Sequence, residues 1–141
     1  MSAAIKEAKS AFSEDDVPVG AVIVRNDEVI ISTHNRRNVE NNALLHAEMI
    51  AIDSACRLLD SRLLDDCDIY ITLEPCPMCA GAIIQSGIRK VYFGAYDPKA
   101  GCAGSVTDLF ILPFNSKPEV YGGIMEDECA SLLSDYFKFK R

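Results

Sequence analysis

Two short motifs carry residue types that can do chemistry. They are His46-Ala47-Glu48 and, further along, Pro75-Cys76-Pro77-Met78-Cys79. One histidine and two cysteines supply three ligands for zinc, and a catalytic zinc site leaves its fourth position to water. Glu48 is not needed as a ligand and can move protons. The pattern predicts one Zn²⁺ per chain, bound by His46, Cys76 and Cys79, with Glu48 as the catalytic proton carrier in a hydrolysis by zinc-activated water.

A structural zinc site is the main alternative interpretation of these motifs. A Cys-x-x-Cys pair alone indicates a structural site or a redox pair equally well. A structural site would want four protein ligands, and no fourth is obvious, although a spare cysteine remains an alternative. His34 is the only other histidine, and we expect it in a loop or at a strand end. We expect the remaining cysteines to be small buried hydrophobic residues; they are Cys56, Cys67, Cys102 and Cys129.

Two predicted helices must position the ligands. Pro77 suits the first turn of a helix, so a helix is expected to begin at the cysteines and to end at Gly87. Small or apolar residues recur at helical spacing from Ala47 onward, which predicts a second helix beginning near His46. Residues two apart on a regular helix point in roughly opposite directions. His46 and Glu48 can therefore share a pocket only if His46 lies in the irregular first turn.

The rest of the chain alternates between strand and helix patterns. Strands are expected at residues 19–24, 29–31, 69–73 and 91–93, with a weak fifth at 119–121, and the first two form an antiparallel pair joined by a turn at 25–28. Further helices are expected over residues 5–12 and 129–137. These elements predict an α/β fold, specifically a three-layer α/β/α sandwich with a mixed sheet of about five strands. At 141 residues, one domain spanning 1–141 is expected.

Composition narrows the class of protein. Hydrophobic residues make up 49% of the chain, yet the longest apolar stretch, residues 17–24, contains Pro18 and Gly20 and is too short to cross a membrane. The first residues do not resemble a secretory signal, so a soluble, cytoplasmic protein without a membrane partner is expected. The net charge of −7 argues against broad binding of nucleic acid through many phosphates. A small local basic patch is still compatible with it, and Lys138, Lys140 and Arg141 form the one clear basic cluster.

The combined pattern H-x-E…P-C-x-x-C resembles the signature of zinc-dependent nucleobase deaminases. The resemblance to the bacterial tRNA adenosine deaminases of this superfamily continues at residues 16–21, 72–83 and 93–101, at Gly104-Ser105 and Asn115, and at residues 133–137. It implies a cytidine deaminase-like fold and a homodimer that converts the wobble adenosine of a tRNA anticodon loop to inosine. Its partner would be the anticodon stem-loop.

The same resemblance implies a set of substrate-binding residues. Asn35 would contact the nucleoside, the backbone around Ala47 would hold the base, and Val19 and Ala21 would lie near it. Asp97 and Lys99 would meet the ribose or neighbouring nucleotides. By local chemistry alone, Asn35 and Asp97 also suit turns. Of Tyr136 and Phe137, at least one is expected in the core, while the other is placed to stack on a splayed base.

Two departures from the family pattern keep other functions open. The segment before His46 lacks the proline that the family usually has there, and Ser116 stands where a histidine is common. Together with the acidic charge, the changed segment motivates an alternative, a zinc-dependent deaminase of a free base or nucleoside of the guanine or cytosine type. A zinc-stabilised binding module without turnover is the third hypothesis.

Overall fold

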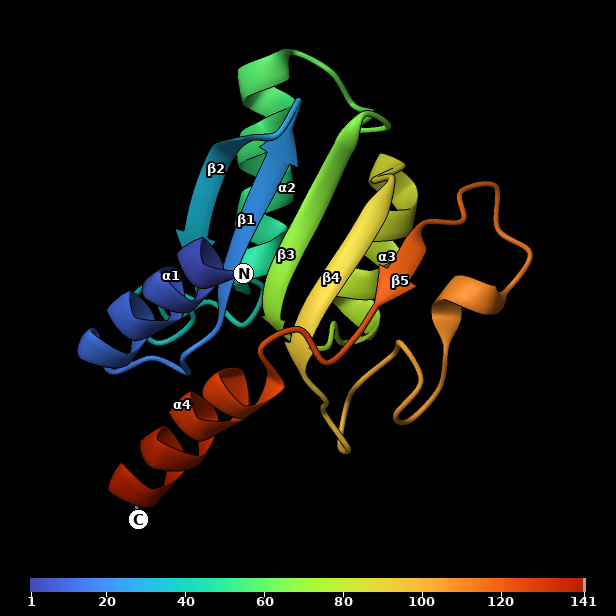
Figure 1. Ribbon diagram of the computed structural model, residues 1–141. Helices are drawn as coiled ribbons and strands as arrows, with labels where there is room; N and C mark the ends of the chain where they lie inside the picture. Colours follow the sequence, from blue (N-terminus) through green and yellow to red (C-terminus); the bar gives the residue numbers. More distant parts are fainter. Residues whose placement is uncertain (141) are drawn as a thin grey trace.

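A single mixed sheet carries the fold, with strands in the order β2-β1-β3-β4-β5. The computed structural model describes residues 1–140 (Figure 1). The strands are β1 (Gly20–Arg25), β2 (Glu28–His34), β3 (Cys67–Leu73), β4 (Lys90–Ala95) and β5 (Glu119–Tyr121). β1 is antiparallel to both β2 and β3, whereas β3, β4 and β5 are parallel. All five predicted strands are confirmed.

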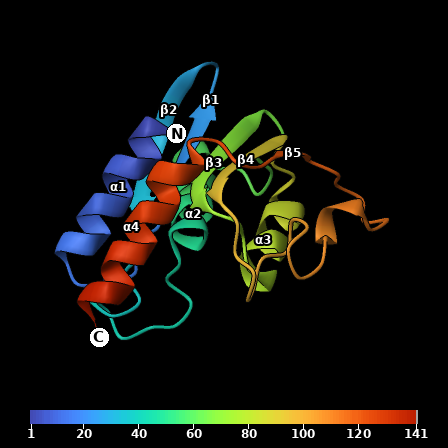
Figure 2. The same cartoon turned by 60° about the horizontal axis from the view of Figure 1, so that its bottom comes forward.

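Two helices cover each face of the sheet. The helices are α1 (Ser2–Ser13), α2 (Ala47–Leu59), α3 (Pro77–Ser86) and α4 (Glu126–Phe139), with a short 3₁₀ helix η1 (Leu109–Ile111) that was not predicted. α2 and α3 contact each other on one face, and α1 and α4 lie side by side on the other (Figure 2). The predicted three-layer α/β/α sandwich is therefore confirmed.

The hairpin between β1 and β2 follows from its turn residues. Asn26 and Asp27 have positive φ values of 52° and 61°, a conformation that these two residue types tolerate and that tight hairpins require. β2 is longer than the predicted strand at 29–31, because its backbone pairing with β1 continues through Thr33 and His34. These polar side chains fit an edge strand, where hydrophobicity stops before pairing does.

The main core lies between the sheet and the α2/α3 layer. Most of its fully buried members come from β1, β3, β4 and the two helices, among them Ile23, Ile69, Ile83, Val91 and Ala51. α3 ends where expected, at Gly87, which has a φ of 72°. Packing against one face of neighbouring strands brings the first residues of α2 and α3 to the same edge of the sheet.

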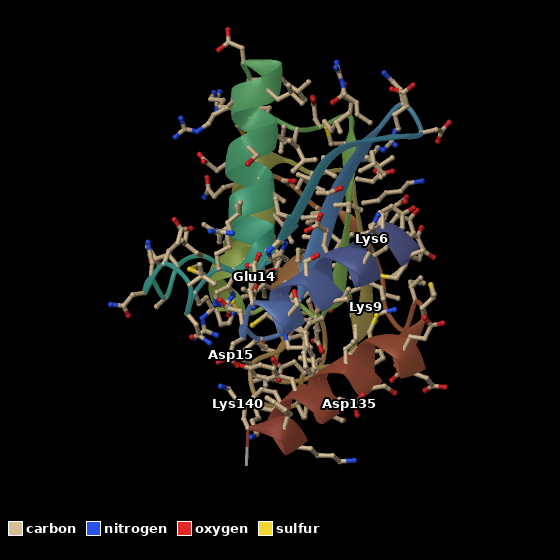
Figure 3. The ribbon with its side chains drawn as sticks, turned by 90° about the vertical axis from the view of Figure 1, so that its left-hand side faces the viewer. Lys6, Lys9, Glu14, Asp15, Asp135 and Lys140 are labelled. Carbon is tan, nitrogen blue, oxygen red and sulfur yellow. The ribbon has the colours of Figure 1, made fainter. Side chains whose placement is uncertain are left out.

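The C-terminal helix is fastened to the segment between α1 and β1. Lys140 Nζ forms an ion pair with Asp15 at 2.7 Å, and the Tyr136 hydroxyl donates to the Asp15 carbonyl at 3.4 Å (Figure 3). Tyr136 is buried, and Phe137 is 50% exposed. Arg141, the last member of the basic cluster, lies outside the described residues.

Three of the four remaining cysteines are buried, as expected. All six cysteines are free, and Cys67, Cys102 and Cys129 are buried while Cys56 is partly buried. Over residues 1–140, no helix has the length and apolar character needed to cross a membrane.

Candidate active site

The three predicted metal ligands lie together where α2 and α3 begin. His46 is the N-cap of α2 with φ −69° and ψ 148°, an extended conformation outside the helix. Because His46 lies outside the helix, its side chain need not point away from that of Glu48. The geometric condition for a shared pocket is therefore met. Cys76 is the N-cap of α3 with φ −76° and ψ 175°, and Cys79 follows on its first turn.

The ligand atoms have the spacing of a tetrahedral zinc site. His46 Nδ1 lies 3.7 Å from Cys76 Sγ and 3.5 Å from Cys79 Sγ, and all three ligand atoms are within 4.8 Å of one another. Usual Zn–N and Zn–S bond lengths at tetrahedral angles place N and S about 3.5 Å apart. The donor set and its spacing therefore fit zinc.

No fourth protein ligand completes the cluster within residues 1–140, where the group of potential ligands is His46, Cys76 and Cys79 alone. The buried Cys102 directs its Sγ to the Ala100 carbonyl instead. His34 ends β2 and contacts Glu7 at 2.6 Å through Nδ1. A three-ligand set is typical of a catalytic zinc site and not of a structural one.

Hydrogen bonds couple the protonation of the three ligand side chains. Hydrogen bonds from the Cys79 thiol and from His46 lower the pKa of Cys76 to about 4. The same bond to Cys76, together with burial, raises the pKa of Cys79. The hydrogen bond with Cys76 also raises the pKa of His46. These contacts favour the thiolate form of Cys76, which is the form that binds metal, whereas Cys79 and His46 would have to give up protons to bind zinc.

Glu48 is an enclosed carboxyl group beside the ligands. It is 3% exposed, and its Oε1 has no hydrogen-bond partner within residues 1–140. Burial raises the pKa of Glu48, because a low dielectric disfavours the charged form. A buried polar atom without a partner is costly, so it indicates a ligand or reacting group in the adjoining space.

That space is a cavity of about 440 Å³ whose floor includes His46, Glu48 and Cys76. Val17, Val19, Asn35 and Arg37 line it before α2, and residues 96–100 line it after β4. α4 contributes Leu133 and Phe137. Segments far apart in the sequence therefore meet around the metal ligands.

The predicted substrate-binding residues fall into two groups. Val19, Asn35, Asp97 and Lys99 line the cavity. Ala21 and Ala47 are fully buried and are not part of the lining. The Ala47 backbone N–H donates to Asn35 Oδ1 at 2.8 Å, so Asn35 braces the start of α2.

Asp97 both stabilises a turn and lines the cavity. Its Oδ1 accepts from the backbone N–H groups of Lys99 at 3.0 Å and Ala100 at 3.2 Å. The turn interpretation is thus correct for Asp97, and the turn itself faces the cavity. Asn35 lies just after β2 and not within a turn.

Glu74 is an organising residue that the sequence reasoning missed. It is 1% exposed, and its carboxylate accepts backbone N–H bonds from Asp97, Ala103 and Ser105 at 2.9–3.1 Å and a hydroxyl bond from Ser105. Burial opposes ionisation of Glu74, but these hydrogen bonds outweigh it and hold its pKa below the usual value. Gly101 is required beside it, because an added Cβ would overlap the carboxyl group.

The available signal for Glu74 was its position, a charged residue directly between a buried strand and Pro75-Cys76. Arg37 was also missed, since nothing in the Asn-Arg-Arg-Asn stretch distinguishes it from Arg36. Both line the cavity.

Comparisons with known proteins agree with this geometry. The sequence model of one protein family, the cytidine and deoxycytidylate deaminase zinc-binding region, matches residues 1–95, which include all three ligands. The tRNA-specific adenosine deaminase of Bacillus subtilis (strain 168) is 48% identical over 139 residues, covering 98% of this chain and 86% of that protein.

Solved structures give the same result. One, from studies of A-to-I editing by tRNA:A34 deaminases at the wobble position of transfer RNA, has a TM-score of 0.88 and 42% identity, covering 94% of this chain and 97% of that one. A guanine deaminase from Bacillus subtilis has a TM-score of 0.65 and 30% identity, covering 97% and 88%. The cytidine deaminase-like fold is thus confirmed, and the chain belongs to the cytidine and deoxycytidylate deaminase zinc-binding family, in its branch of tRNA-specific adenosine deaminases.

Proposed function

We propose that this chain hydrolyses the wobble adenosine of a tRNA anticodon loop to inosine and releases ammonia. One observation carries the proposal: a three-ligand zinc site beside an enclosed carboxyl group, in a chain 48% identical to a tRNA-specific adenosine deaminase over almost its whole length. The reaction consumes one water, whose oxygen becomes the carbonyl oxygen of inosine.

When bound, zinc would supply an activated water to the ring carbon that carries the amine. Glu48 would take a proton from this water, pass it to a ring nitrogen and then assist departure of the amine. Its burial suits this role, because a raised pKa allows a carboxyl group to accept and hold a proton near neutral pH. The partnerless Oε1 is free of competing bonds within residues 1–140.

The cavity walls would hold the nucleoside. Asn35 Oδ1 is occupied by Ala47, which leaves the Asn35 amide hydrogens to donate to the substrate. Val19 offers an apolar contact for the base, and the backbone of Ala47 acts through Asn35. Asp97 and Lys99 would contact the ribose or neighbouring nucleotides, and the half-exposed Phe137 would stack on a splayed base.

The decisive assay is inosine formation in an anticodon stem-loop by the zinc-loaded protein. A matched stem-loop with guanosine at the wobble position controls for background, and free adenosine tests the need for RNA. We expect turnover of the adenosine stem-loop alone. An unchanged stem-loop adenosine would refute the proposal.

A second candidate is deamination of a free base such as guanine. It is favoured by the likeness to the guanine deaminase structure and by the net charge of −7. The stronger likeness to tRNA-specific adenosine deaminases ranks it second. Ammonia release from a panel of free bases and nucleosides without RNA would decide for it. A zinc-stabilised binding module predicts no ammonia release from either kind of substrate.

We also propose that the chain acts as a homodimer in the cytoplasm. Exposed apolar side chains between β4 and β5 support a partner chain; they are Val106, Ile111, Leu112 and Phe114. A tRNA substrate supports the cytoplasmic location. Sedimentation should give twice the mass of one chain, and a mass near that of one chain would contradict the dimer.

A further inference from the structure

Arg37 has a fixed backbone on the cavity wall between β2 and α2. The next residue, Asn38, donates its backbone N–H to Asp16 Oδ2 at 2.9 Å, and Asp16 is fully buried. The Arg37 carbonyl accepts from the Asn42 N–H at 2.9 Å. The backbone on both sides of Arg37 is therefore held in place before any substrate binds.

The Arg37 side chain, in contrast, has no partner within residues 1–140. Its Nε is enclosed without an acceptor, and the guanidinium forms no ion pair. The neighbouring Arg36 contacts Glu40 at 3.0 Å and Glu14 at 3.7 Å. Of two consecutive arginines, one is thus neutralised by carboxylates, while the other has no carboxylate partner within residues 1–140 and keeps its charge and its terminal N–H donors for a ligand.

The position of Arg37 limits what that ligand can be. The residue lines the same cavity as Glu48 and Lys99. A guanidinium matches the geometry of a phosphate through two parallel N–H bonds. In the proposed RNA substrate, the anions nearest to the reacting adenosine are its own 5′ and 3′ phosphates.

We propose that Arg37 binds a phosphodiester that flanks the target adenosine. This inference rests on the proposed function and adds to it a subsite for the RNA backbone. It explains how a strongly acidic chain selects a polyanion: Arg37 lines the cavity without an ion pair within residues 1–140, whereas Arg25, Arg57 and Arg89 pair with carboxylates elsewhere. A free base or nucleoside offers this subsite no phosphate.

The test compares Arg37→Gln with Arg36→Gln, which removes the same charge one residue away. Both are assayed with the anticodon stem-loop in the zinc-loaded full chain, after zinc content and thermal midpoint are checked against wild type. Loss of a charge-assisted phosphate contact should raise KM about 10-fold in Arg37→Gln, with kcat nearly unchanged. The salt dependence of KM should weaken by about one charge. Arg36→Gln should retain the wild-type KM.

Substrates with a neutral methylphosphonate at the 5′ or the 3′ phosphate identify the contact. With wild type, one of them should raise KM about as much as Arg37→Gln does. With Arg37→Gln, the same substitution should add less than about a twofold effect, because the contact is already lost. A role confined to loop structure predicts independent, multiplicative effects at both positions.

The outcomes separate this inference from the proposed function. An active wild type with unchanged KM in Arg37→Gln, or with multiplicative effects at both phosphates, overturns the Arg37 subsite and leaves the deaminase intact. Wild type that leaves the stem-loop adenosine unchanged refutes both.

Discussion

Replacement of Glu74 by Gln should destabilise the cavity wall after β4 although the two side chains have nearly the same shape. Glu74 Oε2 accepts from Ala103 N–H at 2.9 Å and from Ser105 N–H at 3.1 Å, and Oε1 accepts from Asp97 N–H at 3.0 Å and from the Ser105 hydroxyl. Gln retains one oxygen and presents an NH₂ group to the donors on the other side. With the NH₂ group at the Oε2 position, two backbone N–H donors lose their acceptor. At the Oε1 position only the Asp97 N–H does, because the Ser105 hydroxyl can rotate to accept from the amide.

The size of the effect follows from these contacts. An unsatisfied buried donor costs about 1–3 kcal/mol, and the better orientation of the amide leaves one such donor, so we expect a loss of about 2 kcal/mol in the free energy of unfolding. For a chain of this length, that loss corresponds to a fall of about 7 °C in thermal midpoint. Since Asp97 and Lys99 lie on the loosened wall, KM for the stem-loop should rise as well.

Urea denaturation of the zinc-loaded proteins measures the change, with zinc content determined for each variant. Glu119→Gln is the matched control, because Glu119 is an exposed carboxylate on β5 and does not line the cavity. Its free energy of unfolding should stay within about 0.5 kcal/mol of wild type.

The pH dependence gives the same prediction an independent check. The folded state lowers the pKa of Glu74 from 4.5, so the unfolded chain binds its proton first as pH falls. The contribution of Glu74 to stability is complete above pH 4.5 and is lost as pH falls through the lower folded value. The difference between wild type and Glu74→Gln should therefore shrink below pH 4.5. A difference under about 1 kcal/mol at pH 7, or one that grows on acidification, would refute the reasoning.

Three further changes test the site. Glu48→Gln should lower kcat about 1,000-fold with zinc retained, since only the proton carrier is lost, and substantial turnover would exclude Glu48 from that role. Cys76→Ala leaves two zinc ligands, so the zinc content measured by plasma mass spectrometry should fall well below one ion per chain. In wild type, zinc affinity should fall as pH falls, because the ligands must be deprotonated. Phe137→Ala should raise KM for the stem-loop about 10-fold, because base stacking is lost. Phe139 is 76% exposed and does not line the cavity, so Phe139→Ala should leave KM unchanged. Equal effects of the two substitutions would exclude the stacking role of Phe137.

The elements of the fold were predictable where hydrophobic periodicity coincides with backbone pairing. Ile69, Ile71 and Val91 are completely buried, so the apolar pattern and the strand extend together. At β2 the two separate: the edge strand continues through Ser32 and Thr33 after the apolar run has ended. η1 was missed because a three-residue 3₁₀ helix has too few residues to show a period.

The residues of the site also differ in whether the sequence alone could identify them. The metal ligands were predictable because zinc requires particular atoms, and their types and spacing are written in two short motifs. The requirement that His46 lie outside the regular turns of the helix could also be predicted, and its extended N-cap conformation meets this requirement. Glu74 could not be identified, because its role depends on donors 23 to 31 residues away in the sequence. Ala21 matches the family pattern but is enclosed by the core, so its influence on the cavity must pass through its neighbours.

Once the ion pairs are known, the acidic net charge is a weaker argument against an RNA substrate than composition alone suggests. Several arginines pair with carboxylates away from the cavity, as Arg25 does with Asp66 and Arg89 with Asp68. These pairs add nothing to a phosphate-binding surface, and their acids offset no charge at the site. Arg37 and Lys99 instead reach the cavity wall, without an ion pair to any residue within 1–140. Selection of RNA by this chain therefore depends on a few cations placed beside the reacting base, and net charge cannot measure them.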